Sequence, residues 1–323
     1  MVWRSCVVAW AGACVCLGAS PAASLAGDPV LVATDATFGS PMVYHLDPAS
    51  GQVLLAEPLT GTGTLGPTPL SALSFGSDGR LLGFTPNTDN MLYSISRETG
   101  VATRVGRLQL TAREGGLATF ADGTVYGAST GSPARLFSVN PSTGRATAGA
   151  AIDIATDISG LGARADGLLV GLDLRNVEAP PALRLIDPET GETALLAALL
   201  PRIELADVGG LEVIDRDGTE TGYYIVTGSG AGSMAQLWRF DPYTGVQEPV
   251  GVIPGVGQVT GLAGLPCDAC AVDLDGDCEA TIFDFLLLGN WFDTGDIRAD
   301  IDGNGVLDLF DFLLFLNLFD QGC

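Results

Sequence analysis

The feature that most constrains the fold of this chain of 323 residues is a turn motif that recurs at nearly regular intervals. Five segments share it: VYHLDPASGQVLLA, LYSISRETGVATRVG, LFSVNPSTGRATAG, LRLIDPETGETALL and LWRFDPYTGVQEPVG. Their turn glycines are Gly51, Gly100, Gly144, Gly191 and Gly245, so successive turns lie 49, 44, 47 and 54 residues apart. A period of this length is typical of blade and solenoid architectures.

Each repeat predicts four strands. In four of the five motifs, Pro fits the second position of a type I turn and Gly the left-handed residue that follows, a combination that closes a β-hairpin. A second hairpin signal lies between these turns, in ALSFGSDGRLLGF, GLATFADGTVYGA, GLGARADGLLVGL and GLEVIDRDGTETGYYIV, where an Asp-Gly or similar polar turn joins two apolar strands. Four-stranded units repeated around a ring form a β-propeller.

The ends of the repeat region predict how the ring closes. The segment over residues 29–38 begins partway through a repeat, and the last repeat stops at residues 259–265. We therefore expect five blades, one of them built from both ends of the region, with the Gly-rich strands innermost because space near the axis is tight. A ring of six or seven blades and an open β-solenoid are the alternatives.

Most of residues 29–265 resembles a broad class of secreted propellers whose blades carry LYxIDPxTGxxTxVG followed by GLAFxxDGxLYG. These motifs are turn and packing signals, so the resemblance implies a fold and no particular activity.

The first 26 residues have the layout of a secretory signal peptide, with Arg4, an apolar run over residues 6–17 and cleavage expected after Ala26. The run is shorter than the ~20 residues of a membrane-spanning helix. A lipoprotein anchor on Cys14 or Cys16 is the main competing interpretation. No later segment is long and apolar enough to span a bilayer, so we expect a secreted or cell-surface protein.

Charge divides the mature chain into two domains. Residues 27–266 hold twenty-five acidic residues and thirteen Arg, whereas residues 267–323 hold thirteen acidic residues and one Arg. The formal net charge of −23 argues against a nucleic-acid partner, which needs clustered basic side chains. We expect a cation to bind the acidic tail, residues 267–323.

Cysteine use fits an oxidising compartment. The mature chain keeps four cysteines, namely Cys267, Cys270, Cys278 and Cys323, which predicts two disulfides with three alternative connectivities. The first pair also has the CxxC spacing of zinc and redox sites, but no second CxxC and no nearby His completes such a site.

The propeller region contains few candidates for catalysis. Its one histidine, His45, lies in an alternating strand, and we interpret it as a strand residue. Three acids lie three or four residues before the leucine of an expected innermost strand and could face the axial mouth: Glu114, Asp157 and Asp207. Acids from three adjacent blades would suit glycoside chemistry or a metal site; otherwise they cap loop turns.

The tail contains two loops with oxygen ligands at positions 1, 3, 5, 7, 9 and 12, the spacing of an EF-hand. The first comprises Asp273, Asp275, Asp277, Glu279, Thr281 and Asp284; the second comprises Asp300, Asp302, Asn304, Val306, Asp308 and Asp311. Position 7 offers its backbone carbonyl, and the carboxylate at position 12 can bind with both oxygens. The spacing predicts two calcium ions, each loop being followed by a helix, over residues 282–293 and 309–320.

These duplicated loop-helix halves, with the FDF and N-x-F-D motifs and the final Gly-Cys, resemble a GC-type dockerin domain over residues 267–323. The resemblance implies an EF-hand-like fold that calcium stabilises and a cohesin-like or other cell-surface partner. Two departures stand out. Cys278 replaces the usual Gly at position 6 of the first loop, and positions 10 and 11 are Ile282, Phe283 and Leu309, Phe310 in place of small hydroxyl residues.

Two classes of function follow. The first is an exported, non-catalytic propeller that binds a carbohydrate or protein ligand and is held in place by the calcium-dependent tail. The alternative is a carbohydrate-active enzyme, a glycoside hydrolase or lyase, displayed by the same tail. The lack of a recognisable nucleophile or general-base motif favours the first.

Overall fold

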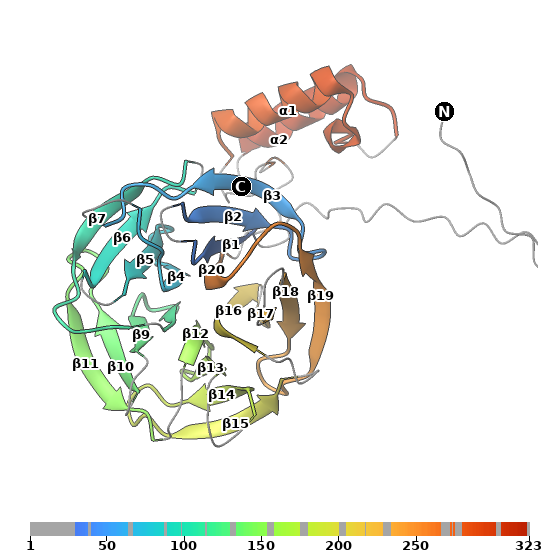
Figure 1. The fold of residues 1–323 in the computed structure, drawn as a ribbon. Helices are drawn as coiled ribbons and strands as arrows, with labels where there is room; N and C mark the ends of the chain where they lie inside the picture. Colours follow the sequence, from blue (N-terminus) through green and yellow to red (C-terminus); the bar gives the residue numbers. More distant parts are fainter. Residues whose placement is uncertain are drawn as a thin grey trace, which may run out of the picture.

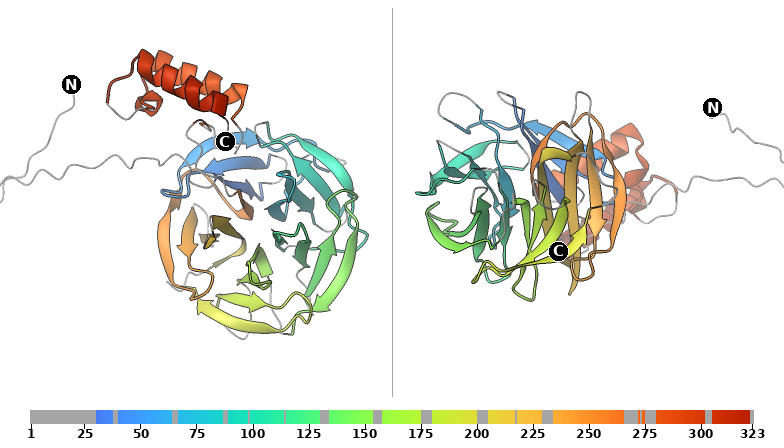
Figure 2. Two further views of the ribbon diagram at one scale, coloured as in Figure 1. Left: turned by 180° about the vertical axis from the view of Figure 1, so that it is seen from behind. Right: turned by 60° about the horizontal axis from the view of Figure 1, so that its bottom comes forward.

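The computed structural model describes residues 30–37, 40–63, 67–86, 89–97, 99–113, 115–129, 134–153, 158–174, 180–199, 205–216, 218–228, 234–265, 272, 274, 280–301 and 305–321. Figure 1 shows five sheets set as blades around one axis, and Figure 1 and the left view of Figure 2 place the two C-terminal helices outside the ring. Each sheet has four strands and every named strand pairing is antiparallel. The chain therefore folds as a five-bladed β-propeller followed by a small helical unit.

The strands run outward from the axis in each blade. Blade 1 is β20 (Val259–Leu265), β1 (Val30–Asp35), β2 (Met42–Leu46) and β3 (Val53–Pro58). Blade 2 is β4 (Ala72–Phe75), β5 (Leu81–Thr85), β6 (Met91–Ile95) and β7 (Ala102–Arg107). Blade 3 is β8 (Leu117–Thr119), β9 (Val125–Ser129), β10 (Arg135–Val139) and β11 (Ala146–Ala151). Blade 4 is β12 (Ile158–Ala163), β13 (Leu169–Asp173), β14 (Ala182–Ile186) and β15 (Thr193–Ala198). Blade 5 is β16 (Leu205–Arg216), β17 (Thr219–Gly228), β18 (Ala235–Phe240) and β19 (Gln247–Ile253).

Blade 1 closes the ring, as the sequence predicts. Its innermost strand, β20, comes from the end of the domain and pairs antiparallel with β1 from the beginning, with Val32 opposite Ala263 and Ala33 opposite Leu262. The last strand thus supplies the position that the first repeat lacks. Both the blade count and the shared blade are confirmed.

The repeated turn motif works through its aspartate and its glycine. In blade 5, the Asp241 carboxylate accepts hydrogen bonds from the backbone N–H of Tyr243 at 2.8 Å and of Thr244 at 3.0 Å. These bonds lower the pKa of Asp241. Gly245 then adopts a φ of +71°, which favours glycine. Asp187 and Gly191 repeat the arrangement in blade 4.

The apolar core lies between neighbouring blades. Five clusters of buried residues each combine side chains from two adjacent blades. Between blades 2 and 3, for example, the rings of Phe84 and Phe137 meet edge to face with centroids 6.1 Å apart. Stability therefore depends on a closed ring, because each blade buries one face against each neighbour.

Glycines let the innermost strands approach one another. A Cβ added to Gly160 would lie 2.5 Å from the backbone nitrogen of Leu211 in the next blade, and one added to Gly210 would lie 2.6 Å from that of Leu262. Gly116 and Gly261 make the equivalent contacts. The expected Gly-rich strands are indeed innermost, where no side chain fits.

The C-terminal unit has its own core. It contains helix α1 (Ile282–Thr294), the short 3₁₀ helix η1 (Ile297–Ala299) and helix α2 (Leu309–Gln321), within one residue of the predicted bounds. Leu288 and Phe315, from the two helices, are buried in one cluster. Thr281 caps α1, and Gly295, with a φ of 70°, ends it. Among the described helices, none is long and apolar enough to span a membrane.

Candidate functional site

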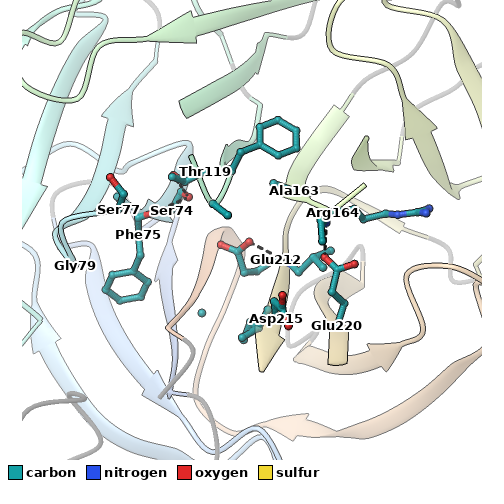
Figure 3. A pocket seen from close by; sticks show the side chains of 17 residues that line it. Ser74, Phe75, Ser77, Gly79, Thr119, Ala163, Arg164, Glu212, Asp215 and Glu220 are labelled. Carbon is teal, nitrogen blue, oxygen red and sulfur yellow. Dashed lines mark hydrogen bonds between the residues drawn. The ribbon is translucent and has the colours of Figure 1, made fainter. Parts of the chain in front are cut away.

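The ring encloses a pocket of about 450 Å³ on its axis. All five blades line it, near the carboxyl ends of their innermost strands, and Figure 3 shows the side chains converging on one space. The deeper lining comes from Ser74 and Phe75 of β4, Thr119 of β8, Ala163 of β12, Glu212 of β16 and Gly264 of β20. Beyond this depth the glycine and leucine residues of the same strands leave no space for a water molecule. The pocket is therefore a funnel with a closed floor.

Glu212 is the buried acid of this funnel. Its side chain is 5 % exposed, and its Oε1 accepts a hydrogen bond from the backbone N–H of Val213 at 2.9 Å. Burial raises the pKa of Glu212 well above its usual value, although hydrogen bonds from the backbone of Val213 and Gly264 oppose the shift. Burial is the larger of these opposing effects.

Opposite Glu212, the funnel wall carries three hydroxyl side chains and is also lined by Phe75 and Phe120. Figure 3 places Ser74, Ser77 and Phe75 across the space from Glu212, with Thr119 between them. The Ser74 Oγ and Thr119 Oγ1 atoms are 2.9 Å apart and share a hydrogen bond. Phe120, which also lines the pocket, packs edge to face on Tyr126 at 5.7 Å. This wall offers a polar edge and an apolar surface to a ligand.

The rim carries a network that joins blades 4 and 5. The Arg164 guanidinium donates to Asp166 Oδ2 at 2.5 Å and to the Pro242 carbonyl at 3.0 Å, and its Cζ lies 4.1 Å from the centroid of the Tyr243 ring. The Tyr243 hydroxyl in turn donates to Glu220. Arg164 is thereby held at the rim by groups other than Glu212.

Sequence reasoning missed Glu212, although its position carries a signal. The residue after the innermost leucine is Ser74, Ala118, Gly162 and Ala263 in the other four blades and Glu212 in blade 5. A single long acid among small residues at the axis marks a special position. The importance of Glu212 becomes clear only once these five residues are known to lie at the same depth along the ring axis.

The predicted axial acids are not placed. Glu114 and Asp157 lie outside the described residues, and Asp207 lies in β16 with a side chain that the structure does not describe. His45 is a buried residue of β2, with its Nε2 atom 3.1 Å from the Arg97 carbonyl oxygen. That placement agrees with its interpretation as a strand residue.

The structure describes half of the predicted calcium ligands: Thr281, Asp284, Asp300, Val306, Asp308 and Asp311. The others, Asp273, Asp275, Asp277, Glu279, Asp302 and Asn304, lie outside the described residues, as do Cys267, Cys270, Cys278 and Cys323. Within the described part of the chain, no three His, Cys, Asp or Glu residues gather in a way that could hold a metal ion.

The described residues of the two loops make hydrogen bonds within their own loops. Asp300 Oδ2 accepts from the backbone N–H of Gly305 at 2.6 Å, and Gly305 has a φ of +82° at position 6. In the first loop, Asp284 accepts from the N–H groups of Leu274 and Thr281, both at 2.7 Å. The Asp300 and Asp284 carboxylates thus each bond to backbone N–H groups of their own loop.

Comparison with known proteins adds little beyond the fold. No protein-family model and no curated protein matches the chain. Among solved structures, the chain is similar to TolB from Acinetobacter baumannii, with 13% identity, a TM-score of 0.43 and coverage of 74% of this chain and 67% of that one. It is also similar to a protein of unknown function from Bacteroides caccae, with 11% identity, a TM-score of 0.39 and coverage of 73% and 98%.

Proposed function

We propose that this protein is an exported, non-catalytic propeller that binds a ligand in its axial funnel and is held in an extracellular or cell-surface assembly by its calcium-dependent, dockerin-like tail. The observation that supports it best is the closed funnel itself. It is a concave site of about 450 Å³ lined by both apolar and polar side chains, within the range of pockets that hold small molecules.

The alternative, a carbohydrate-active enzyme, is supported by one observation. Glu212 has the raised pKa that a general acid needs. Glycoside hydrolysis also needs a second carboxylate across the scissile bond. The other acids that line the funnel are Asp215, which is exposed, and Glu220, which accepts a hydrogen bond from Tyr243 at the rim. This arrangement favours binding over turnover.

For the tail, the proposal includes one calcium ion in each loop. Asp300, Asp308 and Asp311 would offer side-chain oxygens and Val306 its carbonyl in the second loop, with Asp284 and Thr281 in the corresponding places of the first. A bound calcium ion would offset the mutual repulsion of carboxylates gathered in a folded loop. The proposal also includes disulfides among Cys267, Cys270, Cys278 and Cys323.

The partner surface of the tail is proposed to be the start of both helices. Phe283 is 61 % exposed and Phe310 is 69 % exposed, at equivalent positions of α1 and α2. Ile282, Leu286, Leu309 and Leu313 are exposed beside them. At each helix start, neighbouring exposed apolar side chains form a candidate interaction surface. We assign these residues to the contact with a cohesin-like or other cell-surface protein, the kind of partner that the dockerin resemblance implies.

Two experiments test the function. Purified full-length protein is incubated with a polysaccharide panel, and both binding and product release are measured; binding without turnover supports the proposal, and turnover that Glu212→Gln abolishes establishes the enzyme instead. Separately, retention on cells of the source organism is measured with calcium and with a chelator. Retention that depends on calcium and is lost in the Phe283→Ser, Phe310→Ser double variant supports the tail's role. Retention that is unaffected by the chelator and by the double substitution contradicts it.

A further inference from the structure

Glu212 is a buried acid without a cationic partner. The groups that act on it in the structure are its buried surroundings and two backbone N–H groups, those of Val213 and Gly264. Among the described residues, no ion pair reaches it. A buried carboxyl of this kind strongly favours a ligand that can supply positive charge, because pairing offsets the cost of ionising it.

The titratable groups around the funnel reinforce this preference. Asp215 and Glu220 line the pocket from blade 5, and Arg164 lines it from blade 4, while β4, β8 and β20 contribute no titratable side chain to the lining. The charge of Arg164 is matched by Asp166 at 2.5 Å, and Figure 3 shows the guanidinium directed away from Glu212. The funnel thus has an acidic mouth in a protein of formal net charge −23, which attracts cations.

The rest of the funnel suits a compact apolar body. Phe75 and Phe120 line the funnel beside the hydroxyls of Ser74 and Thr119. Phe75 is only 7 % exposed, and the Arg97 guanidinium carbon lies 5.6 Å from the centroid of its ring. Hydroxyl oxygens accept hydrogen bonds from an ammonium group. The closed floor limits the length of a ligand along the axis. Charge, hydroxyl acceptors and size therefore point to one class of ligand.

We propose that the axial funnel binds a primary organic ammonium ion with a small apolar body, its ammonium group paired with the Glu212 carboxylate and its body in the space between the five innermost strands. The inference rests on the proposed ligand-binding function of the same site. Binding transfers the Glu212 proton, where it is present, to the solvent, and the ammonium ion keeps its own protons. No covalent bond forms or breaks.

The test compares two ligands of nearly equal shape, the 2-phenylethylammonium ion and 2-phenylethanol. Binding to the full-length protein is measured by calorimetry at pH 7 in two buffers that differ in ionisation enthalpy and contain no primary amine. The ammonium ion is expected to bind at least tenfold more tightly than the alcohol, with a buffer-dependent enthalpy that reports proton release. Glu212→Gln is expected to reduce its affinity at least tenfold and to leave that of the alcohol within about twofold.

A matched control is Glu192→Gln, which removes an exposed charge from a turn that does not line the funnel and is expected to change the affinity for the ammonium ion less than threefold. Equal affinities of the wild-type protein for the two ligands, or no binding of either, would overturn the inference even if the variant failed to fold. Tight binding of the alcohol would leave ligand binding by the funnel intact, and only turnover on the polysaccharide panel removes the non-catalytic function.

Discussion

Asp284 and Asp311 have the same place in two different helices. Each is the third residue of its helix, each has a fully buried side chain, and each accepts a hydrogen bond through Oδ2 from the backbone N–H three residues earlier: Thr281 at 2.7 Å and Asp308 at 2.9 Å. The two halves of the tail therefore share one design, in which a buried carboxylate ties a loop to the helix that follows it.

Calcium removal should melt the helical unit selectively. If each loop binds one ion, a chelator is expected to lower the midpoint of the circular dichroism signal at 222 nm by roughly 10–30 °C. A ligand bound only to the native state stabilises it by about 3–4 kcal/mol at 100 to 1,000 times the dissociation constant, and 1 kcal/mol shifts the midpoint of a small domain by about 4–8 °C. The described helices all lie in the tail, so this signal reports on it. A midpoint that ignores the chelator would contradict the calcium proposal.

Removing the charge of Asp311 should weaken the tail. Asp311→Asn keeps the size of the side chain but replaces the carboxylate at the helix start, and loss of about 1–3 kcal/mol is expected from the buried hydrogen bond. Urea unfolding followed at 222 nm measures the change. The control is Asp293→Asn at an exposed position of α1, which should stay within about 0.5 kcal/mol of wild type. Equal effects of the two substitutions would refute the role of Asp311.

Glu212 should make the propeller less stable as the pH rises. Its pKa is raised by burial in the folded state, so above about pH 4.3, the ordinary value for glutamate, the native protein holds more protons than the unfolded chain. Stability then falls with increasing pH until the native group ionises. The glutamine in Glu212→Gln cannot ionise, so the variant should not lose folding stability in this way as the pH rises.

The measurement is the melting temperature of wild type and Glu212→Gln between pH 4 and pH 8. The variant is expected to gain on wild type by at least about 2 °C across this window, since 1 kcal/mol corresponds to about 2–4 °C for a domain of this size. Glu192→Gln, at an exposed turn position, should show no such trend. If the difference in melting temperature between Glu212→Gln and wild type does not depend on pH, burial does not raise the pKa of Glu212 in the folded state.

An added methyl group at the axis should destabilise the ring. In Gly210→Ala the new Cβ would lie 2.6 Å from the backbone nitrogen of Leu262, so two innermost strands must move apart. We expect a loss of about 1–3 kcal/mol or more, the cost of overpacking. Gly257→Ala is the control, because its Cβ would meet nothing within 4 Å. Equal losses of stability for the two variants in thermal unfolding would contradict the tight axial packing.

Local signals were enough to predict the propeller. The turns at Gly51 and Gly245 are set by neighbouring residues, and the repeat length then fixes four strands per blade. Helix α1 was predictable for the same reason, since Thr281 and Gly295 cap it. Elements whose ends are encoded within a few residues can be predicted from sequence.

The funnel could not be predicted in this way. Glu212, Ser74 and Thr119 are far apart in the sequence and face one space only because the ring closes through β20 and β1. Whether an acid at such a position is buried depends on the side chains of four other blades. The sequence analysis instead selected loop acids near strand starts, because a sequence gives only the separation of residues along the chain.

The shared first blade also decides how the protein would respond to force. The tail follows directly from β20, which has a strand partner on one side only, β1. A partner that grips the tail would therefore pull on the innermost strand of the ring. The hydrogen bonds of an antiparallel pair lie perpendicular to the strands, so a pull along β20 would load this ladder in shear, and the same register that closes the ring would bear the tension.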